Sequence, residues 1–363
     1  MVASIEQPSP AFEPLRVVAP PSGPNAVGRP LDRVSARDAV IDTLRGIAIL
    51  MVIGIHSLPK PDGSALVTAV DAALRPCVPV FLFASGYLSA PSAHIPVVKR
   101  IMRALGPYTI AFVAAYLFIA AENPLMDHRP AIIAARYSLA YVFVYYYVFV
   151  YVGCSVLLWL VFEAANGNPA KRQPRLIVFL SLSIVIGLAI GAYLAPLLRY
   201  FGVPGPAVEE VRMRDLPFWF GFMALGVIVG RLELQRLLQD LRIPLLAVTV
   251  AGYAGYVSVR VFGIGDAAGY DSIAFFVYAA FFCLGTLAFA PNIPALSFLG
   301  SASYAIYLWH IFAIMVLRDL LAPHPQPVAA FFIEYGAALA SSAALVLAVR
   351  SLTMPRLAQW LGA

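Results

Sequence analysis

The sequence predicts an all-α fold, a polytopic integral membrane helical bundle of about ten transmembrane helices. Of its 363 residues, 61% are hydrophobic and 12% are charged, whereas soluble domains average roughly 45–50% and 25%. The mean hydropathy is +0.83. The apolar residues gather in runs close to the roughly 20 residues that cross a bilayer as a helix. These observations exclude a pair of soluble domains and make the lipid bilayer the first expected partner.

Ten apolar runs predict the ten helices. The second run contains Pro76 and Pro79, which lack a backbone donor, and the sixth run is short. Together the runs form one transmembrane domain, which we place at residues 41–355. In chain order the predicted helices are residues 42–58, 73–90, 104–120, 140–163, 176–198, 216–230, 243–262, 271–290, 296–317 and 328–349.

The N-terminal segment and the loops predict the orientation. Residues 1–40 contain seven prolines and no apolar run, so we expect a disordered cytoplasmic tail and not a cleaved signal peptide. With ten spans both termini lie on one side, and that side receives 15 of the 25 Lys and Arg residues against nine on the other. Short loops rich in Lys and Arg face the cytoplasm, so both termini are predicted to be cytoplasmic.

The net charge of +6 does not indicate a nucleic-acid partner. Only three of the 25 basic residues are lysines, and no basic cluster belongs to a foldable soluble module. Cys77, Cys154 and Cys283 lie far apart, in or beside apolar runs, so they fit neither a disulfide framework nor the spacing of metal ligands. We therefore expect no metal. The sequence does not determine the oligomeric state.

The first predicted helix places three polar residues on one face. Arg45 and His56 are eleven positions apart, so they differ by about 20° around the helix axis and by roughly 16 Å along it. Asp42 precedes Arg45 by three residues and shares its face. Charge facing lipid is costly, so this stripe predicts a water-filled or protein-lined site. The alternative is an interfacial Asp42–Arg45 ion pair with His56 as a packing residue.

The spacing of Arg45 and His56, with Leu-Arg-Gly-Ile-Ala at residues 44–48, resembles the first helix of the membrane-bound acyltransferase 3 family. Two further segments are similar to family motifs. Residues 79–88 read Pro-Val-Phe-Leu-Phe-Ala-Ser-Gly-Tyr-Leu, where Leu82 replaces an aromatic residue, and residues 303–310 read Ser-Tyr-Ala-Ile-Tyr-Leu-Trp-His.

The second helix and the loop after it provide the predicted donor site. Ser85 and Tyr87 place hydroxyls at the end of this helix; the alternative for them is helix packing. Arg100 and Arg103 are spaced to grip the phosphates of an acyl-coenzyme A (acyl-CoA) donor at the cytoplasmic mouth. The alternative for both arginines is the ordinary excess of positive charge in cytoplasmic loops.

The last two helices provide the predicted acceptor site. Ser303, Tyr307 and His310 form a polar stripe on the ninth helix, which is typical of a bundle interior or a cavity. Glu334 is an ionisable residue inside the last apolar run. We assign these four residues to substrate binding. The alternatives are interhelical hydrogen bonding for His310 and a solvated position near the outer surface for Glu334.

The resemblance implies a membrane O-acyltransferase, most often an O-acetyltransferase. It implies transfer from cytoplasmic acyl-CoA, commonly acetyl-CoA, to a hydroxyl of an extracytoplasmic or lipid-linked sugar, and a multi-pass location in a bacterial inner membrane. His56 is the expected general base because imidazole titrates near neutral pH. Arg45, with Asp42 beside it, would orient the donor or stabilise charge. Direct transfer and a covalent acyl-His56 intermediate both remain open.

Two other classes of protein fit parts of the sequence. A transporter or flippase of a glycan or small metabolite, without covalent chemistry, would line its pathway with the same intramembrane charges; inverted repeats would favour it, and none is visible. A scaffold protein of an envelope complex would make the motif matches accidental. Cells with His56→Ala distinguish these classes, because loss of glycan ester with unchanged glycan export supports the enzyme.

Overall fold

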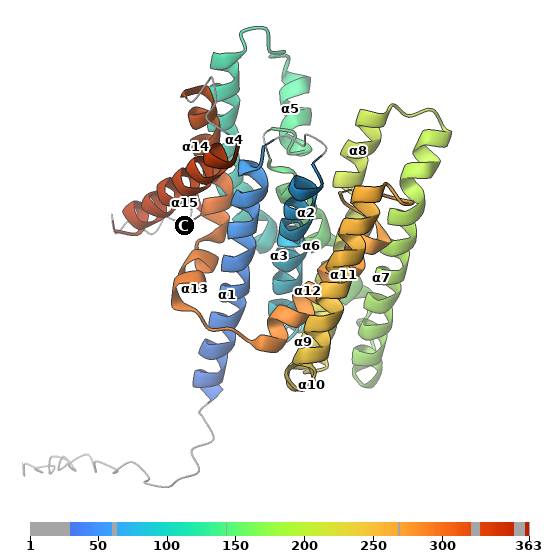
Figure 1. The fold of residues 1–363 in the computed structure, drawn as a ribbon. Coiled ribbons are helices and arrows are strands. Elements are labelled where there is room, and N and C mark those ends of the chain that lie inside the picture. The colour runs from blue at the N-terminus through green and yellow to red at the C-terminus, as the bar shows by residue number, and fades with distance from the viewer. Residues whose placement is uncertain are drawn as a thin grey trace, which may run out of the picture.

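A computed structural model describes residues 30–59, 64–142, 144–267, 269–320, 327–351 and 360–362. Within these ranges the regular secondary structure is helical, without strands, which confirms the all-α prediction (Figure 1). The helices are α1 (Pro30–Ser57), α2 (Ala65–Leu74), α3 (Cys77–Ser89), α4 (Val97–Glu122), α5 (Pro130–Ser138), α6 (Tyr146–Ala164), α7 (Pro169–Tyr200), α8 (Gly205–Met213), α9 (Leu216–Arg231), α10 (Gln235–Asp240), α11 (Arg242–Phe262), α12 (Ile273–Phe289), α13 (Pro294–Ser301), α14 (Ser303–Leu320) and α15 (Pro327–Ser351).

Each of the ten predicted spans corresponds to helix. Nine helical segments of the described residues are long and apolar enough to cross a membrane, and α12 is a shorter apolar helix of 17 residues. The second span is divided into α2 and α3 at Arg75 and Pro76, since proline has no N–H to donate. The ninth predicted span consists of two helices, α13 and α14, which meet at Ala302.

The first helix defines the two ends of the bundle. Residues 1–29 of the predicted tail lie outside the described residues, and α1 begins at Pro30. We call the end of the bundle near the start of α1 the Arg45 end, and the opposite end the His56 end. α5 and α8 lie toward the His56 end, whereas α10 and α13 lie toward the Arg45 end (Figure 1).

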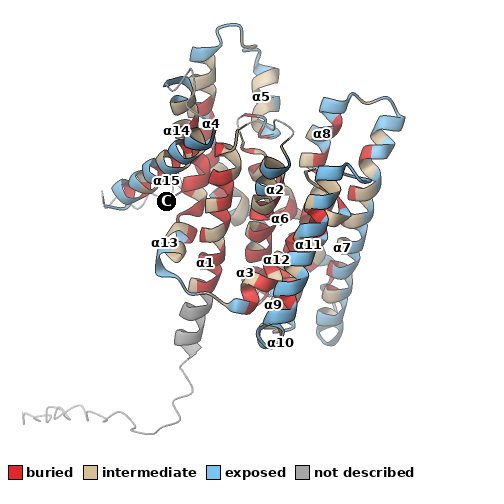
Figure 2. Cartoon of the chain, viewed as in Figure 1, coloured by how far each residue is buried: buried red, intermediate tan, exposed pale blue. Residues whose placement is uncertain are grey.

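Burial is strongest in the helices at the centre of the bundle. α1, α3 and α9 are lined with buried residues, whereas α7 and α11 expose much of their surface (Figure 2). The exposed residues of α7 and α11 include Leu182, Val185 and Val250. Large apolar side chains on the outer surface suit a hydrocarbon environment, in which helix association relies on close packing.

Glycines permit two close helix crossings near the candidate site. A Cβ atom at Gly300 of α13 would overlap the carbonyl oxygen of Asp42 in α1, and one at Gly86 of α3 would overlap the carbonyl oxygen of Met223 in α9. Small residues let membrane helices approach at backbone distance. The first crossing seats α13 against the Asp42 turn of α1 and brings the start of α14 to the Arg45 end.

Candidate functional site

Two cavities lie toward opposite ends of the bundle. The larger, of about 500 Å³, is lined by Arg45 and by residues of α3, α4, α6 and α14. The smaller, of about 300 Å³, is lined by His56 and by residues around the start of α6, the end of α8 and the α11–α12 loop. We call them the Arg45 cavity and the His56 cavity. The predicted stripe on α1 therefore contributes to two cavities, because its guanidinium and its imidazole line different ones.

Three arginines line the Arg45 cavity, and its described lining includes no Asp or Glu residue. Arg45 Nη1 lies 3.0 Å from Asp42 Oδ1, as the spacing of these residues predicted. Asp42 itself is not part of the cavity lining. Arg103 lines the cavity and is exposed. The wall is therefore positively charged, and Asp42, outside the lining, forms an ion pair with Arg45.

Arg100 is fixed in the same wall by two serines at the end of α3. Its Nη2 donates to Ser85 Oγ at 2.5 Å and its Nη1 donates to Ser89 Oγ at 2.6 Å. Ser89 Oγ in turn donates to the carbonyl oxygen of Ser85 at 2.6 Å. The buried Nε of Arg100 has no hydrogen-bond partner among the described residues. The guanidinium is thus oriented at the cavity before any ligand binds.

The other predicted residues divide between this cavity and places outside it. Ser303 and Tyr307, which we predicted to bind the acceptor, line the Arg45 cavity. Tyr87, which we expected at the donor, lies away from the cavity lining, and its hydroxyl donates to Gln235 Oε1 of α10 at 3.1 Å.

A layer of tyrosines separates the two cavities. Tyr307 and Tyr147 line the Arg45 cavity, whereas Val144 and Tyr146 line the His56 cavity. The hydroxyl of Tyr307 donates to the carbonyl oxygen of Val144 at 2.7 Å, and the ring centroids of Tyr147 and Tyr307 lie 5.5 Å apart. We call these four residues the partition. One hydrogen bond therefore joins the wall of one cavity to the wall of the other.

The His56 cavity combines aromatic rings with an ion pair. Its lining includes Tyr141, Tyr146 and Tyr270, together with Glu210 and Arg214. Arg214 Nη1 lies 2.5 Å from Glu210 Oε2, and the Arg214 guanidinium lies 5.4 Å from the ring centroid of Tyr141. No sequence signal singled out Glu210, Arg214 or Tyr270. With His56 and the two tyrosines at the start of α6 they come from four separate segments, so only the packing of the chain brings them together.

His56 lies in the last turn of α1, and an ion pair holds this turn in place. Arg318 of α14 donates from Nη2 to the carbonyl oxygen of His56 at 2.6 Å, and the same nitrogen lies 2.9 Å from Glu334 Oε2 of α15. A cation at a helix C-terminus is favourable because the last carbonyl groups are unpaired. Glu334, which we predicted to bind the substrate, is buried, lines neither cavity and forms this ion pair with Arg318.

His310 is fully buried between the two cavities. Its ring lies 5.4 Å from the ring of His56 and 6.3 Å from the ring of Tyr307, measured between centroids. Its Nδ1 lies 2.8 Å from the carbonyl oxygen of Tyr307 and 3.1 Å from that of Ile306. The buried Nε2 has no hydrogen-bond partner among the described residues. The predicted polar stripe of α14 thus extends from the Arg45 cavity to the neighbourhood of His56.

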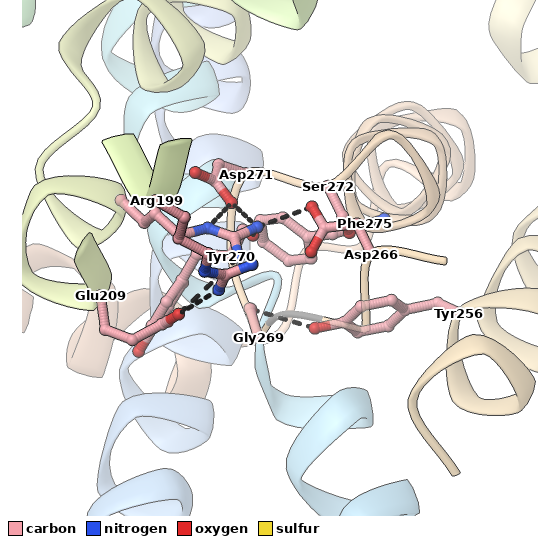
Figure 3. A network of polar contacts seen from close by, with 10 residues as sticks. Arg199, Glu209, Tyr256, Asp266, Gly269, Tyr270, Asp271, Ser272 and Phe275 are labelled. Atoms are coloured by element: carbon pink, nitrogen blue, oxygen red, sulfur yellow. Dashed lines mark hydrogen bonds and ion pairs between the residues drawn. The ribbon is translucent and has the colours of Figure 1, made fainter. Parts of the chain in front are cut away.

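A buried ionic network fixes the loop that holds Tyr270 (Figure 3). Arg212 of α8 forms ion pairs with Asp271 and with Asp266 Oδ2, the latter at 2.6 Å, and its Nη2 donates to the carbonyl oxygen of Tyr270 at 3.4 Å. The hydroxyl of Tyr256 donates to the carbonyl oxygen of Gly269 at 3.0 Å. Burial raises the pKa of Asp271 to about 7, and the guanidinium of Arg212 acts in the opposite direction.

A further guanidinium lies near the His56 cavity, at the break between α2 and α3. Arg75 donates to both carboxylate oxygens of Asp71, at 2.9 and 3.0 Å, and lies 4.4 Å from the ring centroid of Tyr270. Arg75 therefore contacts the ring of Tyr270, whereas Arg212 bonds its backbone carbonyl. Among the described residues, no group of three or more His, Cys, Asp or Glu side chains is arranged to hold a metal ion.

Comparison with known proteins identifies one family. The family model Acyl_transf_3, described as an acyltransferase domain, matches residues 38–350. This range extends from the Asp42 turn of α1 into the last turn of α15 and contains both cavities. Neither the comparison with curated proteins nor that with solved structures gives a match.

Proposed function

The chain belongs to the acyltransferase 3 family and is an integral, multi-pass membrane acyltransferase. From this premise we propose that it transfers an acyl group from a donor in one cavity to an acceptor in the other. Acyl-CoA, in the first place acetyl-CoA, binds in the Arg45 cavity from the cytoplasm. A sugar hydroxyl of an extracytoplasmic or lipid-linked polysaccharide or oligosaccharide binds in the His56 cavity. The membrane is the bacterial inner membrane, with both termini cytoplasmic. One observation supports the proposal above all: a positively charged cavity and an imidazole-lined cavity lie on either side of a thin partition.

The charge of the Arg45 cavity supports a phosphate-bearing donor. Arg45, Arg100 and Arg103 line a cavity whose described lining has no carboxylate. Guanidinium groups bind phosphate through paired N–H donors, and such charge-assisted bonds are about twice as strong as neutral ones. Coenzyme A has three phosphate groups, so its nucleotide end suits this wall. The thioester end would then extend toward Tyr147 and Tyr307 of the partition.

The lining of the His56 cavity supports a carbohydrate acceptor. Tyr141, Tyr146 and Tyr270 offer ring faces with polar hydroxyl edges, and Glu210 with Arg214 adds hydrogen-bonding groups. Sugar rings have apolar faces and polar rims, which match such a wall. The volume of about 300 Å³ is at the lower limit of small-ligand sites, roughly 300–1,000 Å³. This size favours a single terminal sugar ring over a longer oligosaccharide segment.

His56 is the proposed general base. A sugar hydroxyl is a weak nucleophile near neutral pH, so a base must remove its proton as the oxygen attacks the thioester carbonyl carbon. The new C–O bond forms, the C–S bond breaks, and the proton passes to the sulfur of the departing coenzyme A. Arg45 and Arg100 hold the donor. Direct transfer and an acyl-His56 intermediate both require the acyl carbon to pass the partition, so both remain open.

The experiment uses membrane vesicles from the producing cells, which contain the native acceptor. Labelled acetyl-CoA is supplied to the cytoplasmic face, and base-labile label in the glycan fraction is measured. We expect labelling with the wild type and none with His56→Ala or Arg45→Ala, although both variants insert at normal levels. Full labelling with either variant removes that residue from the mechanism. Absence of any acyl label with the wild type, for acetyl-CoA and longer acyl donors alike, would overturn the proposed function.

A further inference from the structure

We propose that His310 is the positioning residue for His56: its free Nε2 accepts a hydrogen bond from the imidazolium that forms when His56 takes the acceptor proton. This inference rests on the proposed function, in which His56 is the base. It gives a specific role to a buried imidazole that the sequence assigned to substrate binding. The argument starts from the tautomer of His310.

The surroundings of His310 determine which of its nitrogens bears hydrogen. Its Nδ1 lies 2.8 Å from the carbonyl oxygen of Tyr307 and 3.1 Å from that of Ile306. Carbonyl oxygens only accept hydrogen bonds, so Nδ1 must be the donor, and Nε2 of a neutral ring is then a lone pair. This Nε2 is buried and without a partner among the described residues. A buried acceptor without a partner costs free energy, so its position needs an explanation.

His56 is the group near enough to use that lone pair. The two ring centroids lie 5.4 Å apart, with the rings tilted by 37°. Imidazole edges in this arrangement need only a small reorientation to form an N–H···N bond, and catalytic hydrogen bonds are often long before substrate binds. His56 also lines the His56 cavity. One edge of its ring can therefore serve the acceptor while the other contacts His310.

The proton balance follows from this arrangement. The acceptor O–H bond breaks and its proton binds the ring nitrogen of His56 that faces the cavity. His56 becomes an imidazolium, and its second N–H donates to Nε2 of His310. When the C–O bond has formed and the C–S bond breaks, the proton on the cavity side leaves His56 for the sulfur of coenzyme A. Both imidazoles are then neutral again, and His310 has neither gained nor lost a proton.

A hydrogen-bond acceptor behind the base has two effects on catalysis. It fixes the orientation of the ring, and it stabilises the charged form of His56 in the transition state. The other charged groups that act on His56 are Arg75, at the break between α2 and α3, and Arg318 of α14; the cavity wall adds Glu210 and Arg214. Arg75 and Arg318 oppose an imidazolium, and each is itself paired with a carboxylate, Asp71 and Glu334. The acceptor on the buried side of His56 is therefore the group that would stabilise the charged ring by direct contact.

Two substitutions separate this role from a structural one. His310→Gln places an amide oxygen near the position of Nε2, whereas His310→Asn keeps only a polar group near the position of Nδ1. Both are measured in the vesicle assay with labelled acetyl-CoA, with the two faces of the membrane held at the same pH. Trp309→Phe is the matched control on the same helix, because Trp309 packs on Phe312 and its Nε1 donates to Leu361.

We expect His310→Asn to lower kcat roughly 10- to 150-fold, the range for a lost hydrogen bond to a charged group, with the KM for acetyl-CoA unchanged. The acid limb of the pH–rate profile of this variant shifts to lower pH, because the imidazolium of His56 has lost its hydrogen-bond acceptor. His310→Gln retains most of kcat and the wild-type limb. If His310→Asn keeps activity and His310→Gln loses it, His310 acts only through the hydrogen bonds of its Nδ1 to backbone carbonyls, and the proposal is overturned.

A second measurement covers the case in which neither variant accumulates. The chain has five histidines, so ¹⁵N spectra of histidine-labelled wild-type protein in lipid nanodiscs resolve their tautomers. A buried ring with hydrogen on Nδ1 and a free Nε2 supports the proposal, and hydrogen on Nε2 of His310 overturns it. If the wild type transfers no acyl group, the proposed function fails; if the wild type is active and His310→Asn matches it in kcat and pH profile, only the present inference fails.

Discussion

Replacement of Arg100 by alanine tests the donor site most directly. The guanidinium of Arg100 is held at the wall of the Arg45 cavity by two short hydrogen bonds, to Ser85 and Ser89. It is therefore already oriented when the donor arrives, and little side-chain entropy is lost on binding. Arg100→Ala removes this cation and leaves both serine hydroxyls without their donor.

The expected effect of Arg100→Ala is a rise in the KM for acetyl-CoA. A hydrogen bond to a charged group contributes about 1.5–3 kcal/mol, which corresponds to roughly a 10- to 150-fold change in KM at about 1.4 kcal/mol per factor of ten. Because Arg100 lines the Arg45 cavity and not the His56 cavity, kcat should change far less. Arg100→Lys should recover part of the loss, since it keeps the charge and loses the planar fork.

The assay measures initial rates of acetyl transfer against donor concentration, with titration of free coenzyme A as a direct measure of binding. Arg236→Ala is the matched control, because Arg236 is an exposed arginine of α10 at the same end of the bundle and outside the cavity lining. If this control raises KM as much as Arg100→Ala, general attraction of the anionic donor explains the effect. A loss confined to kcat in Arg100→Ala would refute the phosphate site.

Three further predictions concern the rest of the site. Arg318→Gln should lower kcat about tenfold or more with donor KM unchanged, because it releases the carbonyl of His56 from a charged donor at 2.6 Å; unchanged kcat in the transfer assay would show that α1 needs no such anchor. Tyr307→Phe should raise release of free coenzyme A without ester formation by roughly two- to tenfold, since it removes the 2.7 Å bond to Val144 that closes the partition; a thiol assay that finds no uncoupled release would contradict this role. Burial raises the pKa of Asp271 to about 7 in the folded protein, above its usual value of about 4, so the folded state holds a proton that the unfolded chain releases, and stability falls as the pH rises toward 7. The Tm of the purified protein should therefore fall between about pH 5 and 7, and fall less in Asp271→Asn; equal slopes for both proteins would contradict the assignment.

The helices were predictable because hydrophobicity in a bilayer is a local property of the sequence. The predicted sixth helix starts at residue 216, which is also the first residue of α9. Asp215 caps this helix by accepting a hydrogen bond from the N–H of Phe218. The ion pair between Asp42 and Arg45 was also predictable, since residues three apart on a helix are neighbours. Pro76 indicated the irregular second span, although not that Arg75 would lie at the break.

The composition of each cavity was not predictable, because it depends on how helices far apart in sequence pack. The last apolar run gave no indication that the carboxylate of Glu334 would pair with Arg318 of the neighbouring helix. The side chains of Glu210 and Tyr270 follow no periodic pattern, and they meet only because α8 and the α11–α12 loop converge near His56. The spacing places Arg45 and His56 on one face of α1, but side chains roughly 16 Å apart along the axis reach different cavities.

The partition between the Arg45 cavity and the His56 cavity also has an electrical consequence. A membrane that holds a voltage does about 2.3 kcal/mol of work on each elementary charge that crosses 100 mV, and an open conduit wide enough for a nucleotide would discharge it. Here the hydroxyl of Tyr307 in α14 donates to the carbonyl oxygen of Val144, just before α6, between the two cavities. In the proposed reaction an acyl group passes this layer in one direction and a proton passes in the other, and both the donor side and the acceptor side keep their net charge. The transfer would therefore neither consume nor discharge the ion gradient, and the anionic coenzyme A would stay on the side from which it came.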